Sequence, residues 1–166
     1  ERVYLPRARA EEFTEALVEH VRSLRLGHGL DAGTDIGPMI EERFRAKVEA
    51  QVAEATAQGA KLLVGGRRPE ASLAGAFYEP AVLTGVDHSM RIMREETFGP
   101  VLPIMSVTSL DEAIRLANDS DYGLTASGWT RSSETARLLQ QRLQAGVVTI
   151  NDCVASYGEP TAPWGG

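Results

Sequence analysis

The stretch Glu95-Glu96-Thr97-Phe98-Gly99-Pro100, followed by the mostly apolar run at residues 101–107, is the most informative part of this sequence. Two carboxylates and an aromatic ring precede a Gly-Pro pair, which predicts a stiff turn that leads into a strand. A carboxylate accepts hydrogen bonds from both hydroxyls of a ribose, and a ring packs on a flat heterocycle. The alternative is a helix end with solvated acids, a core Phe and an ordinary turn, because short motifs recur by accident.

Predicted strands and helices alternate along the rest of the chain. Apolar residues at helical spacing predict a helix at residues 9–25, with Phe13 on its inward face, and another at residues 41–58. Ser109 and Ser132 are predicted to cap two more helices. Apolar and β-branched runs predict strands at residues 2–5, 62–64, 78–85, 101–107, 124–130 and 147–150, the last of which is expected to be buried. This order predicts an α/β fold with a largely parallel sheet and flanking helices.

Composition limits the possible partners. The chain has 166 residues, of which 43% are hydrophobic and 24% charged, as expected for one soluble domain. The net charge of -6 disfavours nucleic acid and anionic membranes, and no apolar stretch approaches the roughly 20 residues of a membrane-spanning helix. A single cysteine, Cys153, excludes an internal disulfide and fits a reducing compartment, so we predict a cytoplasmic protein.

No metal site is expected from this sequence. The three histidines, His20, His28 and His88, lack metal-ligand spacing and cluster with no cysteine or carboxylate. No G-x-G-x-x-G motif follows any predicted strand, so the chain carries no dinucleotide-binding βαβ unit of its own.

The whole chain resembles the aldehyde dehydrogenase superfamily. Members carry an E-E-x-F-G-P-V pattern behind a V-x-x-x-M-x-I segment, and the segment at residues 86–92 precedes Glu95 in that register. Similar pieces follow the family's order at Arg2-Val3-Tyr4, Gly37-Pro38, Gly59-Ala60-Lys61, Gly65-Gly66, Phe77-Tyr78-Glu79-Pro80, Ala117-Asn118, Tyr122-Gly123-Leu124, Ala145-Gly146, Asn151 and Pro163-Trp164-Gly165-Gly166. This ordered agreement favours the ligand-binding interpretation of the turn.

The resemblance implies an aldehyde dehydrogenase catalytic-domain-like fold, with residues 1–166 as a partial catalytic domain and no second domain. It implies NAD or NADP as the cofactor, with the Glu96 carboxylate on the nicotinamide ribose and Phe98 against the nicotinamide. Gly99 and Pro100 would shape the turn. Arg43 would lie near the adenosine part of the cofactor, at a position that varies in the family.

The resemblance places no catalytic residue in this chain. The family's nucleophilic cysteine lies a few residues before the segment that Arg2-Val3-Tyr4 resembles, and its general-base glutamate also lies upstream. We therefore expect a fragment that begins just after the nucleophile and is inactive by itself. Cys153 is an alternative nucleophile, but in the family the corresponding loop borders the substrate tunnel, so the resemblance implies that Cys153 is structural or lines the substrate pocket. Tyr157 and Trp164 would be further walls of that pocket. An ordinary solvated loop with aromatic anchors is the alternative there.

The implied activity of the intact protein is oxidation of a small-molecule aldehyde to a carboxylic acid with NAD(P)+, through a cysteine thioester. Family members form dimers or tetramers, so a homo-oligomer is expected. Two alternatives remain open. The chain could be a non-catalytic structural or oligomerisation fragment, or part of an acyl-CoA or acyl-phosphate reductase on the same fold.

Overall fold

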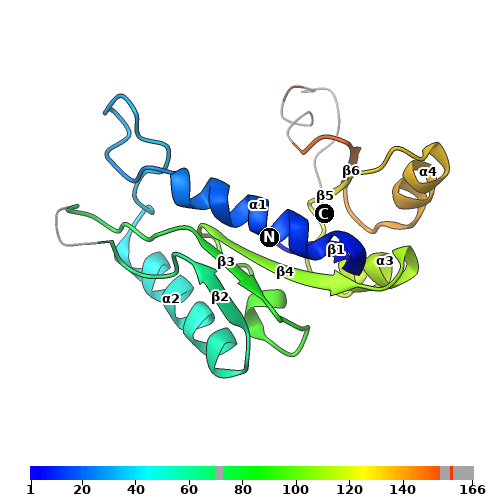
Figure 1. Ribbon diagram of the computed structural model, residues 1–166, viewed down its shortest axis with the longest axis horizontal. Coiled ribbons are helices and arrows are strands. Elements are labelled where there is room, and N and C mark those ends of the chain that lie inside the picture. The colour runs from blue at the N-terminus through cyan, green and yellow to red at the C-terminus, as the bar shows by residue number, and fades with distance from the viewer. Residues whose placement is uncertain (70–72, 154–157, 159–166) are drawn as a thin grey trace. The chain divides into compact units, whose positions relative to one another are not determined.

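The computed structural model describes residues 1–69, 73–153 and 158, which divide into two compact units (Figure 1). The first unit is Glu1–Val107 and the second is Thr108–Gly166. The expectation that the two belong to one partial catalytic domain stays a prediction.

A four-stranded sheet forms the centre of the first unit, in the order β1-β4-β3-β2. The strands are β1 (Val3–Pro6), β2 (Lys61–Val64), β3 (Ala81–Thr84) and β4 (Val101–Val107). β4 runs parallel to both β1 and β3, and only the edge strand β2 is antiparallel to its neighbour β3. The predicted α/β fold with a largely parallel sheet is therefore confirmed.

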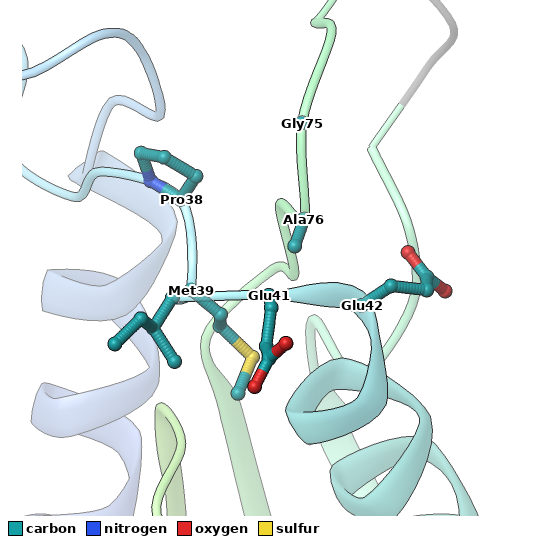
Figure 2. Close-up of a pocket in the computed structure, with 7 residues that line it drawn as sticks. Pro38, Met39, Glu41, Glu42, Gly75 and Ala76 are labelled. Carbon is teal, nitrogen blue, oxygen red and sulfur yellow. The ribbon is translucent and has the colours of Figure 1, made fainter.

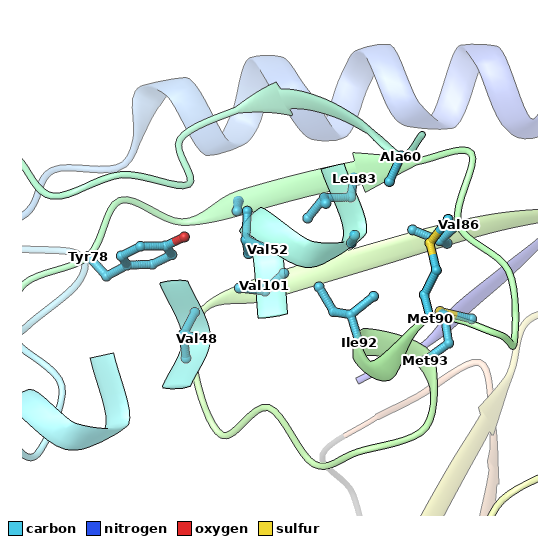
Figure 3. Packing of buried hydrophobic residues seen from close by; sticks show 12 residues of the cluster. Val48, Val52, Ala60, Tyr78, Leu83, Val86, Met90, Ile92, Met93 and Val101 are labelled. Atoms are coloured by element: carbon cyan, nitrogen blue, oxygen red, sulfur yellow. The ribbon is translucent and has the colours of Figure 1, made fainter. Parts of the chain in front are cut away.

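Both faces of this sheet are covered by helices. The helices α1 (Arg7–Ser23) and α2 (Glu42–Ala57) and the short 3-10 helix η1 (Arg91–Met93) complete the unit (Figure 1). Leu83 and Val101 join a core cluster with α2 and η1, shown in Figure 3. Val82 and Ile104 join a second cluster with α1. Because neighbouring strand residues point to opposite faces, β3 and β4 are apolar on both sides.

The buried face of α1 differs from the predicted one. Phe13 was expected to face inward but is 46% exposed, whereas Thr14, Val18 and Val21 are buried. These three recur at i, i+4 and i+7, so the buried stripe is rotated by about one residue and leaves Phe13 at its border. An apolar residue at the edge of a stripe cannot be assigned from spacing alone.

The second unit contains α3 (Leu110–Asn118), α4 (Ser133–Arg142) and the parallel strands β5 (Thr125–Gly128) and β6 (Val147–Ile150). Both predicted caps are confirmed: Ser109 accepts from the Glu112 amide at 3.1 Å, and Ser132 accepts from the Thr135 amide at 3.2 Å. The predicted burial of β6 is wrong. Its residues are half-buried, and within the described residues β5 is its one neighbouring strand.

Tyr78 is a buried polar group of the first unit. Its side chain lies in the core cluster of α2 at 2% exposure, and within the described residues its hydroxyl has no hydrogen-bond partner. Burial raises the pKa of Tyr78 to about 12, because a buried phenolate loses its hydration.

This burial predicts a loss of stability at alkaline pH. An unfolded tyrosine releases its proton near pH 10, whereas folded Tyr78 keeps its proton to about pH 12. The contribution of Tyr78 to the free energy of unfolding is therefore full below pH 10 and is lost between pH 10 and pH 12. By pH 11 the loss is about 1 kcal/mol. In urea unfolding of the full-length protein at pH 8 and 11, Tyr78→Phe should lose less stability than wild type. Tyr122→Phe, at an exposed site, is the matched control. An equal loss in wild type and Tyr78→Phe would contradict the prediction.

Candidate functional site

The hexapeptide forms the turn between η1 and the central strand β4. We call residues 95–100 the Glu95–Pro100 turn. The Ala81 amide of β3 donates to the Pro100 carbonyl at 2.8 Å, and the Val101 amide donates to the Gly99 carbonyl at 2.8 Å. The end of the turn is thus tied to the sheet, while its first residue, Glu95, is bonded through its amide to the Arg91 carbonyl at 2.7 Å.

Glu95 is committed to contacts within the protein. The Arg91 guanidinium binds both of its carboxylate oxygens at 2.9 Å, and Gln51 Nε2 lies 3.4 Å from one of them. Arg91 also bonds Glu54 at 3.0 Å. The hydrogen bonds from Arg91 hold the pKa of the Glu95 carboxyl below its usual range. Glu95 therefore supports the turn and is not offered to a ligand.

Glu96 has the opposite character. Its side chain is exposed, and within the described part of the chain no group donates to its carboxylate. Only its backbone carbonyl is bonded, by the Lys47 ammonium at 2.5 Å. The hypothesis of a pair of acids thus reduces to a single available carboxylate, which is the one that the resemblance assigns to the cofactor.

Phe98 points away from the core. It is 70% exposed and has a left-handed backbone with φ of 50°, which is uncommon for an aromatic residue. Its ring lies 6.3 Å from that of Phe44 on α2. Thr97 is the buried residue of the turn. The alternative of a core Phe is therefore wrong, and an exposed ring on a strained backbone is typical of a binding surface.

Gly99 lets the turn approach α2 closely. A Cβ at this position would lie 2.5 Å from Val48 Cγ2, closer than real contacts allow, and a tight 3.2 Å from Met39 Cε. Because Val48 is a buried core residue that cannot move away, a side chain here would displace the turn. This close packing supports the predicted role of Gly99 in shaping the turn.

Arg43 lies on α2, next to Phe44. Its guanidinium is 5.0 Å from the centre of the Phe44 ring and is paired with Glu41. A groove of about 530 Å³ runs past the start of α2 (Figure 2). Its lining residues are Pro38, Met39, Ile40, Glu41, Glu42, Gly75 and Ala76. Both of its carboxylates are already paired with arginines, so the groove offers a mostly apolar surface.

The predicted substrate-pocket residues are only partly described. Cys153 is an exposed free thiol that follows β6 in the second unit. Tyr157 and Trp164 lie outside the described residues. The pocket that these three were predicted to form therefore stays a prediction.

His28 and His88 contact different aromatic residues. His28 packs edge-on against Phe77 at 5.6 Å, and His88 Nε2 lies 2.9 Å from the Tyr4 hydroxyl. Across residues 1–69, 73–153 and 158, no group of three or more His, Cys, Asp or Glu side chains could hold a metal ion.

Several residues of the site were missed by the sequence analysis. Lys47, Gln51 and Arg91 hold the turn, yet none belongs to the hexapeptide. One signal was available, because Arg91 and Glu95 are spaced i, i+4, as ion pairs on a helical turn are. The contacts from α2 span 44 and 49 residues and leave no local pattern.

Comparisons with known proteins find relatives along the whole chain. The sequence pattern of the "Aldehyde dehydrogenase family" matches residues 1–166. A Mycolicibacterium smegmatis protein named "Putative succinate-semialdehyde dehydrogenase [NADP(+)]" is 44% identical over 168 residues, which cover 100% of this chain and 32% of that protein. Betaine aldehyde dehydrogenase of Bacillus subtilis is 41% identical over 94% of this chain and 32% of its own length.

A solved structure extends the comparison to three dimensions. The crystal structure of betaine aldehyde dehydrogenase from Staphylococcus aureus in complex with NAD+ superimposes with a TM-score of 0.88 at 40% identity. The match covers 91% of this chain and 30% of that one. The chain spans about a third of the length of the curated relatives it matches.

Proposed function

The chain belongs to the aldehyde dehydrogenase family, and from this premise we propose that the intact protein oxidises an aldehyde to a carboxylic acid with NAD+ or NADP+. The observation that carries the proposal is that the two acids of the Glu95–Pro100 turn have different environments. The Glu95 carboxylate is bound by Arg91, whereas the exposed Glu96 carboxylate has no partner among the described residues, and the Phe98 ring two residues on is also exposed.

These two residues fit the nicotinamide ribose and ring. The Glu96 carboxylate can accept a hydrogen bond from each ribose hydroxyl, since among the described residues no group donates to either of its oxygens. The exposed Phe98 ring provides an apolar surface that excludes water beside a flat heterocycle. When bound, the oxidised nicotinamide supplies a hydride acceptor for the substrate carbon.

The covalent step is assigned to a cysteine other than Cys153, the single cysteine of this chain. In the proposed chemistry a cysteine thiolate bonds to the aldehyde carbon, the carbon loses its hydrogen as hydride to the cofactor, and a thioester remains. Water, deprotonated by a glutamate, then releases the acid and the free thiolate. Glu96 and Phe98 position the hydride acceptor and form no bond themselves.

The substrate-pocket proposal rests on Cys153, Tyr157 and Trp164. Exposure of the Cys153 thiol supports a place on a pocket wall, because a lining residue must reach the ligand. The relatives named for succinate semialdehyde and betaine aldehyde suggest a small aldehyde with a charged group at its far end. We further propose a cytoplasmic homo-oligomer, a dimer or tetramer.

Among the described helices, none is long and apolar enough to span a bilayer.

An assay of the full-length protein tests the proposed function. Succinate semialdehyde and betaine aldehyde are offered with NAD+ and with NADP+, and both reduced cofactor and carboxylic acid are quantified. We expect aldehyde-dependent formation of the two products in equal amounts. If turnover occurred only in the reverse direction, from an acyl-CoA or acyl phosphate, the protein would be a reductase and the proposal would be wrong. A stable oligomer that binds neither cofactor would replace it by a structural role.

A further inference from the structure

All four methionines of the sequence gather at one core cluster, the one that joins β3, β4, α2 and η1. Met90 and Met93 belong to the cluster at 3% and 1% exposure, whereas Met39 and Met105 pack against it and are half-buried. A thioether fills irregular apolar space, but oxidation converts it into a polar sulfoxide. Because susceptibility to oxidation follows exposure, the two half-buried sulfurs are less protected than the two buried ones.

Met39 combines partial exposure with a contact on the Glu95–Pro100 turn. It lies just before α2, where its amide donates to the Ala76 carbonyl at 3.0 Å. Its side chain lines the groove at the start of α2, as Figure 2 shows. Its Cε faces Gly99, since a Cβ on Gly99 would lie 3.2 Å from it. One side chain therefore borders both the groove and the turn.

Oxidation of Met39 would disturb this contact. The sulfur is one bond from the methyl group that faces Gly99, and Val48, which is fully buried, packs against the same glycine. A sulfoxide oxygen that is buried beside apolar groups without a hydrogen-bond donor is unfavourable. We therefore expect the oxidised side chain to turn into the groove and to leave Gly99. The turn then loses packing next to Phe98, whose backbone is left-handed with φ of 50° and depends on its surroundings.

We propose that Met39 is a site of reversible oxidation that weakens cofactor binding at the Glu95–Pro100 turn. This inference rests on the proposed function of the turn. The oxidant is hydrogen peroxide, whose oxygen is bonded by the lone pair of the Met39 sulfur while the O–O bond breaks. The proton on the transferred oxygen passes to the departing hydroxide, so the products are the sulfoxide and water. The sulfur is oxidised and the peroxide is reduced by the same electron pair. A methionine sulfoxide reductase with a dithiol as reductant reverses the change.

Peptide mass spectrometry of the full-length protein after treatment with hydrogen peroxide tests the site itself. The peptide that contains Met39 should gain one oxygen at least about fivefold faster than the peptides that contain Met90 and Met93, since those two sulfurs are buried. Equal rates at the three positions, or a Met39 that does not react, would overturn the proposal. This measurement requires no cofactor.

Cofactor titration before and after peroxide treatment measures the consequence. Wild-type protein should lose affinity for NAD+ or NADP+ about fivefold to tenfold, and the reductase should restore the affinity. Met39→Leu, which has a similar volume and no sulfur, is the matched variant and should lose less than about twofold on treatment. It separates oxidation of Met39 from oxidation of cysteines, which both proteins undergo. Met105→Leu, at the other half-buried methionine, should lose affinity as wild type does.

Failure of the proposed function is distinguishable from failure of the role assigned to Met39. If the untreated protein binds no nicotinamide cofactor, the function proposed for the turn is wrong, and control of cofactor binding by Met39 is wrong with it. If the untreated protein binds the cofactor and oxidation of Met39 leaves the affinity unchanged, only the role of Met39 is refuted. An equal loss of affinity in Met39→Leu and wild type would refute that role as well.

Discussion

Glu96→Gln in the full-length protein is expected to lower the kcat/KM for the cofactor roughly tenfold to hundredfold, with kcat reduced and the melting temperature little changed. The amide keeps the size of the side chain but replaces a charged acceptor oxygen by an NH2 group, which cannot accept from a ribose hydroxyl. Because the Glu96 carboxylate has no partner in the described structure, its loss leaves no internal contact broken. Steady-state kinetics and thermal melts measure the two effects separately.

Glu95→Gln is the matched comparison, one residue away. Its carboxylate is bound at 2.9 Å by two nitrogens of Arg91, so the change removes a structural ion pair and not a ligand contact. We expect a less than about threefold change in the cofactor KM and only a small loss of stability, since the pair is partly exposed. Unchanged turnover and unchanged cofactor affinity in Glu96→Gln would refute the role assigned to Glu96. The opposite ranking of the two variants would reassign that role to Glu95.

Arg45→Met is expected to lower the free energy of unfolding by about 2–4 kcal/mol. Arg45 is 9% exposed, and one of its guanidinium nitrogens donates to the Gly75 carbonyl at 3.1 Å and to the Phe77 carbonyl at 3.2 Å. It also pairs with Glu42 on the same helix. Methionine fills a similar volume but leaves both carbonyls without this donor.

The reason for the large effect is the position of the tethered segment. The carbonyls that Arg45 binds lead directly into Phe77 and Tyr78, which are among the largest fully buried side chains of the described structure. Arg67→Met is the control, because Arg67 is 78% exposed and its pair with Glu79 lies at the surface. Urea unfolding of the full-length variants should show a loss of less than about 0.5 kcal/mol for Arg67→Met. Equal losses of stability in the two variants would contradict the role of Arg45 in holding the segment that leads into Phe77 and Tyr78.

Local patterns were sufficient for much of the fold. The boundaries of β4 were predicted correctly, and the helices of the first unit were predicted within two residues at each end. Ser109 and Ser132 were recognised as caps because a cap depends on residues within one helical turn. The partial burial of β6 and the exposure of Phe13 were not predictable, because burial depends on which surfaces the rest of the chain covers.

Pro103 shows the limit of a local rule. Proline lacks the amide donor of a sheet ladder, which argues against a place in an interior strand. The structure nevertheless places Pro103 in β4, paired with Leu83 of β3. The pairing of β4 with β1 begins one residue later, where Ile104 lies opposite Val3, so Pro103 stands beyond the end of that ladder, where a missing amide donor is tolerated.

The sequence by itself determined the family, the α/β alternation and the identity of the residues in the Glu95–Pro100 turn, because each of these depends on neighbours along the chain. Only the tertiary structure decided which acid is free. Arg91 and Gln51 bind Glu95, whereas Lys47 takes the backbone carbonyl of Glu96 and leaves its carboxylate exposed. Two identical side chains in consecutive positions differ only in the partners that distant segments bring to them, and that difference exists only in the folded chain.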